Sequence, residues 1–533
     1  MATYLLVAAI IIFACVIFNK VSRKLGIPTL LAFIILGMCF GSDGIFKINF
    51  DNYYFAEQIC TVALIFIMFY GGAGTRIEEA KSVRAKAILL SSLGTVLTAG
   101  FVGAFCHFVL RFELLESFLI GSVISSTDAA SVFAILRSKK LSLKYKTASI
   151  LEVESGSNDP FSYMLTVIFL TLMGGEISGG KVAYMIFAQV FFGAVSGVVI
   201  AYIALWFFKH YQFKTSGMDS IFVVAVALFS FAVPNIIGGN GYLSAYICGI
   251  ILGNNEIKNK RTIIHFFDGV TGLMQMLLFF LLGLLSFPSQ LGKIALPAIA
   301  IALFITFIAR PVAVWLIFTP FGCRLKQQAL ISWSGLRGAA SIVFAIMTVV
   351  SPNVLKNDIF HIVFFIVLFS ILIQGSLLPY IAKKLGMIDE KGDVMKTFTD
   401  YEYELPVSFI EFEMTDDHTW VGKIIQELKL PQNLIVVLVI RNGEKIIPKG
   451  SVEIFPKDKI VLCGRSVDVD EGIHLSELEI TLGDEYYGKT IREISKPGEM
   501  IVVIKRGKKL VIPDGNTRIL DKDIMIINKE VQI

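Results

Sequence analysis

The stretch LEVESGSNDP, residues 151–160, brings three carboxylates into a segment that otherwise has the character of a membrane helix. Glu152, Glu154 and Asp159 are followed at once by the apolar run FSYMLTVIFLTLM. A charged side chain at the centre of a membrane helix costs about 2.5–3.5 kcal/mol. That cost is tolerated where the charges are paired inside the protein or serve a function. The rest of the sequence contains features that support each explanation.

The composition indicates many membrane spans followed by a more polar tail. Of the 533 residues, 55% are hydrophobic and 17% are charged. About thirteen apolar segments precede residue 386, and most reach the roughly 20 residues that a membrane helix needs. We therefore expect an all-α polytopic membrane domain. The seven cysteines have neither disulfide nor zinc spacing, and we expect no metal cofactor.

Lysine and arginine alternate between rich and poor loops along this domain. The odd-numbered loops are rich, as at 137–146, whereas even-numbered loops such as 41–57 hold few basic residues. The positive-inside rule then predicts an N-terminus outside the cell (inner or plasma) membrane and a cytoplasmic C-terminal tail. Because this topology accounts for the net charge of +5, we expect no nucleic-acid partner.

Two motifs recur at a spacing of about 210 residues. Gly-x-x-x-Gly stands at 37–41 and at 249–253, and TDAAS at 127–131 is matched by RGAAS at 337–341. The recurrence predicts that segments one to six and eight to thirteen form an inverted repeat, a common plan in secondary transporters. Chance is the alternative, because both motifs are frequent in membrane helices.

The tail contains a second, shorter repeat. WVGKIIQEL at 420–428 matches YYGKTIREI at 486–494, about 65 residues later. The run LIVVLVIRNGEKIIP at 434–448 predicts two strands around an Asn-Gly turn. We therefore expect two copies of a small α/β module. The predicted domains are a transmembrane domain at 1–385, a linker at 386–403, and modules at 404–465 and 474–533.

Several ionisable residues are predicted to reach the middle third of the membrane. At 1.5 Å per residue, this depth follows for Asp128, Glu154, Asp159 and Arg337. Transporters place their substrate and coupling-ion sites at that depth. The alternative is a buried ion-pair network, in which Arg337 and Arg310 neutralise carboxylates without any role in transport.

The spacing on the segment after residue 147 indicates which atoms face one point. Glu154 and Asn158 are four residues apart, as are Ser155 and Asp159, so each pair shares a helix face. The small-residue stretches SSTDAAS (125–131) and SGLRGAAS (334–341) are places where a helix can break and offer carbonyl oxygens. Carboxylate, hydroxyl and carbonyl oxygens suit a hard cation such as Na⁺ or K⁺.

The three stretches STDAASVFAIL, LEVESGSNDP and SGLRGAAS resemble the signature segments of the cation:proton antiporter-1 family, the NhaP-type sodium or potassium/proton exchangers. The tail resembles the TrkA-C (RCK-C) regulatory module, and the second copy is the weaker match. The combination is similar to that of potassium/proton antiporters that regulate cell volume. The resemblance covers 1–385 and the first tail module, and no RCK-N domain accompanies it.

The resemblance implies a role for each site residue. Asp159 would carry the ion or the proton. Further ion ligands would be the Thr127 carbonyl, the Asp128 carboxylate, the Ser155 hydroxyl and Glu154 through water, with Asn158, Arg337 and Arg310 in support. It also implies thirteen helices with the fifth and twelfth discontinuous, a homodimer, a role in pH and volume homeostasis, and a small regulatory nucleotide, such as cyclic di-AMP, on the tail.

We therefore expect a transporter rather than an enzyme, exchanging K⁺ or Na⁺ for H⁺ at Asp159. A single titrating group beside Asn158 favours one proton per cation and electroneutral exchange. A channel would need a selectivity filter, and no such motif is present. A sodium-coupled solute symporter and a transport-inactive sensor remain the alternatives. The choice between K⁺ and Na⁺ is open, and the tail favours K⁺.

Overall fold

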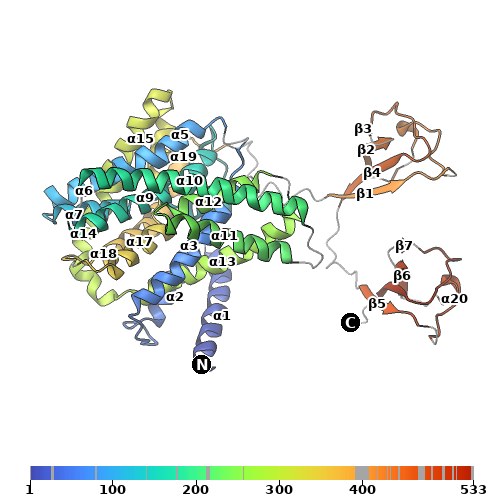
Figure 1. Ribbon diagram of the computed structural model, residues 1–533, viewed down its shortest axis with the longest axis horizontal. Helices are drawn as coiled ribbons and strands as arrows, with labels where there is room; N and C mark the ends of the chain where they lie inside the picture. Colours follow the sequence, from blue (N-terminus) through green and yellow to red (C-terminus); the bar gives the residue numbers. More distant parts are fainter. Residues whose placement is uncertain are drawn as a thin grey trace. The chain divides into compact units, whose positions relative to one another are not determined.

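The computed structural model separates the chain into two compact units, Met1–Tyr403 and Glu404–Ile533 (Figure 1). It describes residues 2–25, 29–77, 81–139, 141–175, 178–211, 217–255, 257, 259–353, 355–389, 407–416, 418–428, 430–431, 434–441, 444–465, 475–481, 484–494, 499–506, 509–511 and 513–529. The first unit is built of helices and the second of two small sheets.

The helices of the first unit follow one another with short connections. Its first half comprises α1 (Ala2–Leu25), α2 (Thr29–Phe40), α3 (Tyr53–Gly74), α5 (Arg84–Leu89), the π-helix η1 (Leu90–Gly94), α6 (Thr95–Phe108), α7 (Leu114–Val123), α8 (Ala129–Ser138), α9 (Thr147–Met173) and α10 (Gly179–His210). Its second half comprises α11 (Met218–Ile236), α12 (Gly241–Gly253), α13 (Lys260–Leu285), α14 (Leu291–Phe304), the π-helix η3 (Ile305–Ala309), α15 (Arg310–Phe318), α16 (Leu325–Trp333), α17 (Ala339–Val350), α18 (Ile359–Phe369), the π-helix η5 (Ser370–Gly375) and α19 (Ser376–Lys384).

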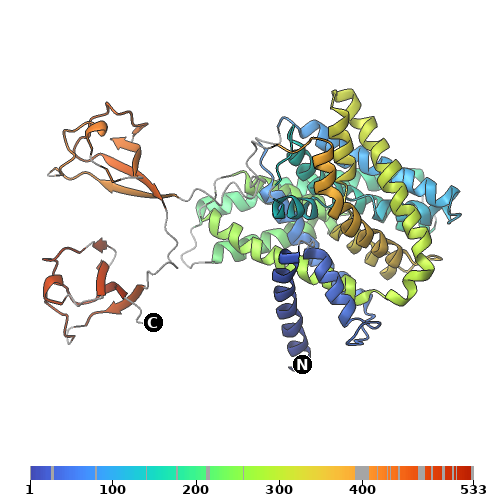
Figure 2. The same ribbon diagram turned by 180° about the vertical axis from the view of Figure 1, so that it is seen from behind.

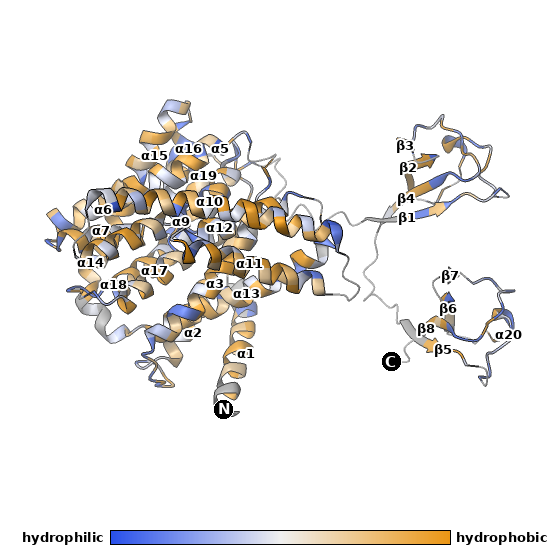
Figure 3. Ribbon diagram, viewed as in Figure 1, coloured by the Kyte–Doolittle hydropathy of each residue, from blue (hydrophilic) through white to orange (hydrophobic). Residues whose placement is uncertain are grey.

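The helices have the apolar character of membrane spans (Figure 3). Among the described residues, seven helical segments are long and apolar enough to cross a membrane, and shorter apolar helices accompany them. Large apolar side chains are exposed on several of them, such as Phe187 on α10, 55% exposed, and Phe13 on α1, 70% exposed. Figure 2 shows that α1 extends away from the other helices, with the N-terminus at its far end.

Several described helix pairs approach so closely that only glycine fits between them, and two of these pairs contain the Gly-x-x-x-Gly motifs. A Cβ atom added to Gly37 on α2 would lie 2.1 Å from the carbonyl oxygen of Phe280 on α13. A Cβ atom added to Gly249 on α12 would lie 2.2 Å from the carbonyl oxygen of Phe69 on α3. Small residues let membrane helices pack backbone against backbone. Both Gly-x-x-x-Gly motifs of the sequence therefore serve such contacts.

The second unit contains two four-stranded antiparallel sheets of the same topology. The first has the order β1-β4-β2-β3 and the second β5-β8-β6-β7. The strands are β1 (Val407–Glu413), β2 (Ile435–Arg441), β3 (Glu444–Ile446), β4 (Lys459–Arg465), β5 (Leu475–Glu479), β6 (Glu499–Arg506), β7 (Lys509–Val511) and β8 (Asp523–Lys529). Even the register shift in β2 recurs in β6. The predicted strands at 434–448 are present as β2 and β3, and the Asn-Gly turn lies outside the described residues.

Each sheet carries the same ion pair, between a buried aspartate and an arginine whose side chain is 30% or 35% exposed. In the first, Arg441 Nε and Nη2 donate to the two carboxylate oxygens of Asp458 at 2.9 and 2.8 Å. In the second, Arg506 makes the same two bonds to Asp523 at 2.9 and 2.7 Å. Burial alone would raise the pKa of Asp458. The bonds from Arg441 and from the Phe455 amide, together with the Arg441 charge, outweigh that effect and hold its pKa below the usual range.

This ion pair predicts how the first sheet responds to pH. The pKa of Asp458 is lower in the folded state than in the unfolded state. The ion pair therefore stabilises the folded sheet fully above the unfolded pKa of about 3.9, and this stabilisation is lost as the pH falls through the folded pKa. At pH 7, Asp458→Asn should lower the free energy of unfolding of this sheet by about 1–3 kcal/mol, because Arg441 loses a charged acceptor. The transition is followed by the fluorescence of Trp420. The measurement uses a variant in which the three other tryptophans are replaced by phenylalanine.

The control is Glu411→Gln on the same sheet. Glu411 and Lys459 form an exposed pair at 3.6 Å, and such surface pairs contribute little. This substitution should leave the unfolding transition unchanged. Equal losses for both variants would show that the pair of Arg441 and Asp458 contributes no more than a surface charge.

Candidate ion-binding site

Two breaks in the helices meet in the interior of the first unit. α7 ends at Val123 and α8 begins at Ala129, while α16 ends at Trp333 and α17 begins at Ala339. The backbone amide of Asp128 in the first break donates to the Leu336 carbonyl of the second at 2.8 Å. Serine hydroxyls compete with helical bonds in the first break, where the Ser125 hydroxyl donates to the Ser122 carbonyl at 2.7 Å.

Arg337 places a positive charge at the open end of α7. Its Nη1 atom donates to the carbonyl oxygens of Ser125 and Ser126 at 2.8 and 2.7 Å. Its side chain is among the largest fully buried ones in the described part of the chain. The C-terminus of a helix carries partial negative charge, and a cation there is stabilising. Arg337 therefore satisfies the carbonyls that the break exposes.

Asp128 places a negative charge at the start of α8. Its carboxylate accepts from the amides of Ala130 and Ser131 at 2.9 and 3.3 Å, and from the Ser131 hydroxyl at 2.5 Å. This is an N-terminal cap, favoured by the helix dipole. A Cβ atom added to Gly338 would lie 2.3 Å from the Asp128 carboxylate, so the same carboxylate also lies at the start of α17.

α9 is bound to the first break by two of its polar side chains. The Ser155 hydroxyl donates to the Thr127 carbonyl at 2.9 Å and accepts from the Ala129 amide at 2.8 Å. One turn farther on, Asn158 Nδ2 donates to the Thr127 hydroxyl at 2.5 Å. The Asn158 side-chain oxygen is buried and has no hydrogen-bond partner among the described residues. The structure therefore brings Thr127, Ser155 and Asn158 together at the first break.

Glu154 is paired with Arg310. Arg310 Nη2 lies 2.5 Å from Glu154 Oε1, and the two side chains are 3% and 1% exposed. The Thr127 hydroxyl also donates to Glu154, at 3.4 Å. This part of the cluster is the buried ion pair that the sequence left as an alternative. Arg337, by contrast, has carbonyl groups as its hydrogen-bond acceptors.

Asp159 differs from the two neighbouring carboxylates. It is 9% exposed, and it accepts a hydrogen bond from the Ser126 hydroxyl. Among the described residues no salt bridge reaches it. Asp128 accepts hydrogen bonds from helix amides and Glu154 from a guanidinium, whereas the donor to Asp159 is the neutral hydroxyl of Ser126. A buried carboxylate without a cation is unstable unless a proton or a metal ion neutralises it.

Ser126 is the site residue that the sequence reasoning missed. It lies in the break SSTDAAS, which was expected to offer backbone carbonyls rather than a side chain. The signal was present, because three hydroxyl residues precede Asp128 in the one stretch that interrupts the helix. Which of the three faces Asp159 depends on the path of the broken backbone, and the sequence does not specify that path.

Removal of the Arg310 cation should destabilise the unit. Arg310→Met leaves Glu154 buried without its partner, which costs about 3–5 kcal/mol. The double change Arg310→Met with Glu154→Gln removes both charges and should recover most of that loss. Thermal unfolding midpoints in detergent measure both variants. Lys356→Met, which breaks an exposed pair with Glu113, serves as the control and should leave the midpoint unchanged. A double variant no more stable than the single one would contradict this account of the pair.

Comparison with known proteins places this site in a family. Residues 8–384 match the model of the sodium/hydrogen exchanger, transmembrane family, and residues 409–471 match the TrkA-C domain. The chain is 32% identical over 473 residues to the K(+)/H(+) antiporter NhaP of Alkalimonas amylolytica, and 30% identical over 480 residues to the K(+)/H(+) antiporter NhaP2 of Shewanella sp. strain MR-4. Each alignment covers 88% of this chain and 82% of the relative.

Among solved structures, the sodium proton antiporter MjNhaP1 of Methanocaldococcus jannaschii has the same fold. The TM-score is 0.63 at 22% identity, and the match covers 72% of this chain and 99% of that one. The helical unit is thus a polytopic membrane domain of a transporter fold, followed by a TrkA-C domain. The extent of the family match, over most of the helical unit and both helix breaks, shows that the chain belongs to the sodium/hydrogen exchanger family.

Proposed function

We propose that the protein is a secondary active antiporter that exchanges K⁺, or Na⁺, for H⁺ at Asp159. The observation that supports this most directly is the contrast among three neighbouring carboxylates, of which Glu154 and Asp159 are buried. Asp128 and Glu154 are compensated by helix amides and by Arg310, whereas Asp159 has only a hydroxyl donor among the described residues. A neutral ligand set around one carboxylate suits a group that is alternately protonated and cation-bound.

The remaining oxygens around Asp159 form the proposed cation site. The Ser155 hydroxyl of α9 donates to the Thr127 carbonyl in the first break, and each oxygen retains a lone pair for a cation. Asp128 contributes negative charge from the starts of α8 and α17. Glu154 contributes through water, because Arg310 already occupies its Oε1 atom. Asn158 and Arg337 hold the broken backbone in place.

Competition at Asp159 couples the two fluxes. One carboxylate cannot hold a proton and a cation together, so loading either one requires loss of the other. An unliganded Asp159 would carry a bare charge through the membrane interior, which is costly. The empty carrier therefore does not change sides, and exchange is obligatory. Because position 158 is asparagine, one group titrates, and exchange is electroneutral.

We propose an architecture of thirteen spans with an inverted repeat. In chain order the spans are α1, α2, α3, α5–α6, α7–α8, α9, α10, α11, α12, α13, α14–α15, α16–α17 and α18–α19. Three correspondences between spans one to six and eight to thirteen support the repeat. Both broken pairs take the fifth position of their half, and two of the three described π-helices, η1 and η3, fall in the fourth. The close glycine contact of α2 with α13 mirrors that of α12 with α3.

The proposed topology places the N-terminus outside the cell (inner or plasma) membrane and the tail in the cytoplasm. The alternating charge of the loops supports this topology. The transmembrane domain then occupies 1–385, the linker 386–403 and the two TrkA-C-like modules 404–465 and 474–533. We further propose a homodimer and tail regulation by a small nucleotide, such as cyclic di-AMP. Potassium is favoured because two of the relatives described above bear the name K(+)/H(+) antiporter.

Asp159→Asn should abolish exchange, because the amide cannot release a proton. Proton flux is measured in liposomes that contain a pH-sensitive dye. Wild-type protein should move protons when K⁺ or Na⁺ is added outside, and the more effective ion identifies the substrate. Glu152→Gln removes a carboxylate from the same helix at a position outside the proposed site, and should retain exchange. Undiminished flux in Asp159→Asn would contradict the proposal. Cation flux that requires an organic solute would support the symporter instead.

Asn158→Asp should convert electroneutral exchange into voltage-dependent exchange. The added carboxylate would give the pair two titrating groups and allow more than one proton per cation. Proton flux measured at clamped membrane potentials distinguishes the two forms. A wild-type rate that already scales with voltage would show that the one-proton argument is wrong. Asn158→Gln, which adds no charge, serves as the control for the change in side-chain contacts.

A further inference from the structure

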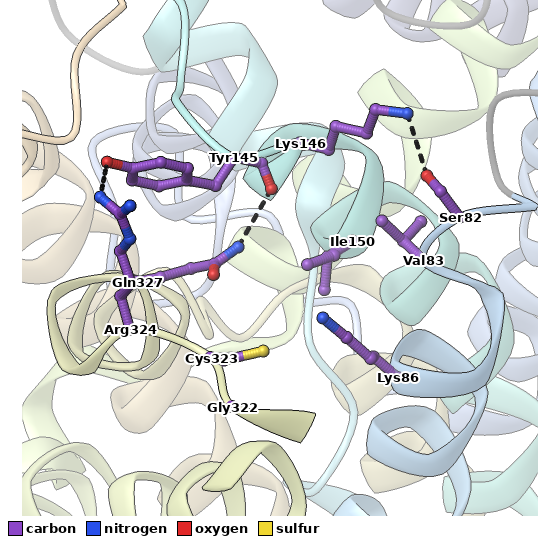
Figure 4. A pocket seen from close by; sticks show the side chains of 10 residues that line it. All are labelled: Ser82, Val83, Lys86, Tyr145, Lys146, Ile150, Gly322, Cys323, Arg324 and Gln327. Atoms are coloured by element: carbon purple, nitrogen blue, oxygen red, sulfur yellow. Dashed lines mark hydrogen bonds between the residues drawn. The ribbon is translucent and has the colours of Figure 1, made fainter. Parts of the chain in front are cut away.

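A cavity of about 330 Å³ lies at the start of α9, apart from the ion site (Figure 4). It is lined by residues from three places in the chain: the segment before and within α5, the start of α9, and the turn before α16 together with the start of α16. Ile150 in its wall precedes Asp159 by nine residues on α9, which is about 13 Å along the helix. By the proposed topology, the cavity opens to the cytoplasm.

Three cations line this cavity, and no acidic residue is among the ten residues that form it. Their partners are neutral. Lys146 Nζ donates to the Ser82 hydroxyl at 3.0 Å, and Lys86 Nζ lies 5.9 Å from the centre of the Phe321 ring. The Arg324 guanidinium lies 4.4 Å from the centre of the Tyr145 ring and donates to its hydroxyl (Figure 4).

Two of these cations occupy positions where a helix disfavours positive charge. Lys146 is the N-cap residue of α9 and Arg324 that of α16, and neither cap makes a side-chain hydrogen bond. Helix N-termini carry partial positive charge and favour anions. Natural caps are serine, threonine, aspartate or asparagine. Two basic caps facing one cavity therefore add like charge to like charge. Both side chains are exposed, so solvent screens part of this repulsion, and an anion in the cavity would relieve more of it.

The backbone adds a further cost at the same place. Tyr145 and Lys146 have φ angles of 59° and 55°, the left-handed region that residues with a Cβ atom seldom adopt. Both side chains line the cavity, where Tyr145 lies toward Arg324 and Lys146 toward Ser82 (Figure 4). Strained residues persist where the surrounding structure determines them, often at ligand sites.

We propose that this cavity binds a phosphate-bearing anion through Lys86, Lys146 and Arg324. Ammonium and guanidinium groups bind phosphate oxygens by charge-assisted hydrogen bonds, and the two helix N-termini supply further positive potential. The volume admits a phosphate with a small attached group. This inference goes beyond ion exchange. The anion comes either from solution or from a lipid headgroup. By binding cations beside α5, α9 and α16, it links these helices at the end of α9, the helix that carries Asp159.

The test uses the full-length protein purified in a neutral detergent. Its thermal unfolding midpoint is followed as inorganic phosphate replaces chloride at constant ionic strength. In a second arm, the protein is reconstituted into phosphatidylcholine vesicles with or without phosphatidylglycerol. Stabilisation by phosphate identifies a soluble ligand, and stabilisation by phosphatidylglycerol alone identifies a lipid headgroup. Either result supports the site, and no effect in both arms overturns it.

Variants then locate the effect. Lys146→Gln should weaken the anion roughly tenfold, because one charge-assisted hydrogen bond is lost. Lys326→Gln removes the same charge from α16 outside the lining, and should change binding less than twofold. Equal weakening by both variants would reduce the effect to general surface charge and overturn the site. If Arg324→Gln fails to fold, Lys86→Gln carries the test, because its ammonium contacts only a ring face.

Discussion

The structure depends on a carboxylate that is buried without a cation. Asp159 lies beside the Ser126 hydroxyl, in a cluster where Arg310 neutralises Glu154 and helix amides stabilise the charge of Asp128. The described interactions therefore compensate two of the three carboxylates, and the third, Asp159, has only a neutral hydroxyl donor. If Arg310 faced Asp159 instead, the cluster would be a structural ion pair, and neither a proton nor a cation would be needed there.

The breaks in the helices make this arrangement possible. A continuous helix would direct its amides and carbonyls along its own axis, whereas the breaks bring the Thr127 carbonyl and the Ala129 amide to face α9. Unpaired backbone groups are costly in a membrane interior. Arg337, Asp128 and Ser155 satisfy them, so each supports the ion site by stabilising broken backbone. Substitutions at these positions are thus expected to affect folding and exchange together.

The sequence predicted the elements better than the contacts between them. The helix that begins at Thr147 and the strands at 434–448 followed from hydropathy, turn residues and period. Helical spacing also predicted which residues of the helix share a face, Glu154 with Asn158 and Ser155 with Asp159, whereas Thr127 was named only because the sequence resembles a known family. The pairing of Glu154 with Arg310 joins residues 156 positions apart, and periodicity holds no information about such a contact. The role of Ser126 likewise depends on the path of the broken backbone.

The most direct test of the central claim is the number of protons released when a cation binds. Purified protein in a weakly buffered detergent solution is titrated with K⁺ or Na⁺, and the released protons are counted with a pH indicator. Competition at one carboxylate predicts close to one proton per bound cation at pH values where Asp159 is protonated, and none from Asp159→Asn. Cation binding without proton release in the wild-type protein, at every pH tested, would contradict the account.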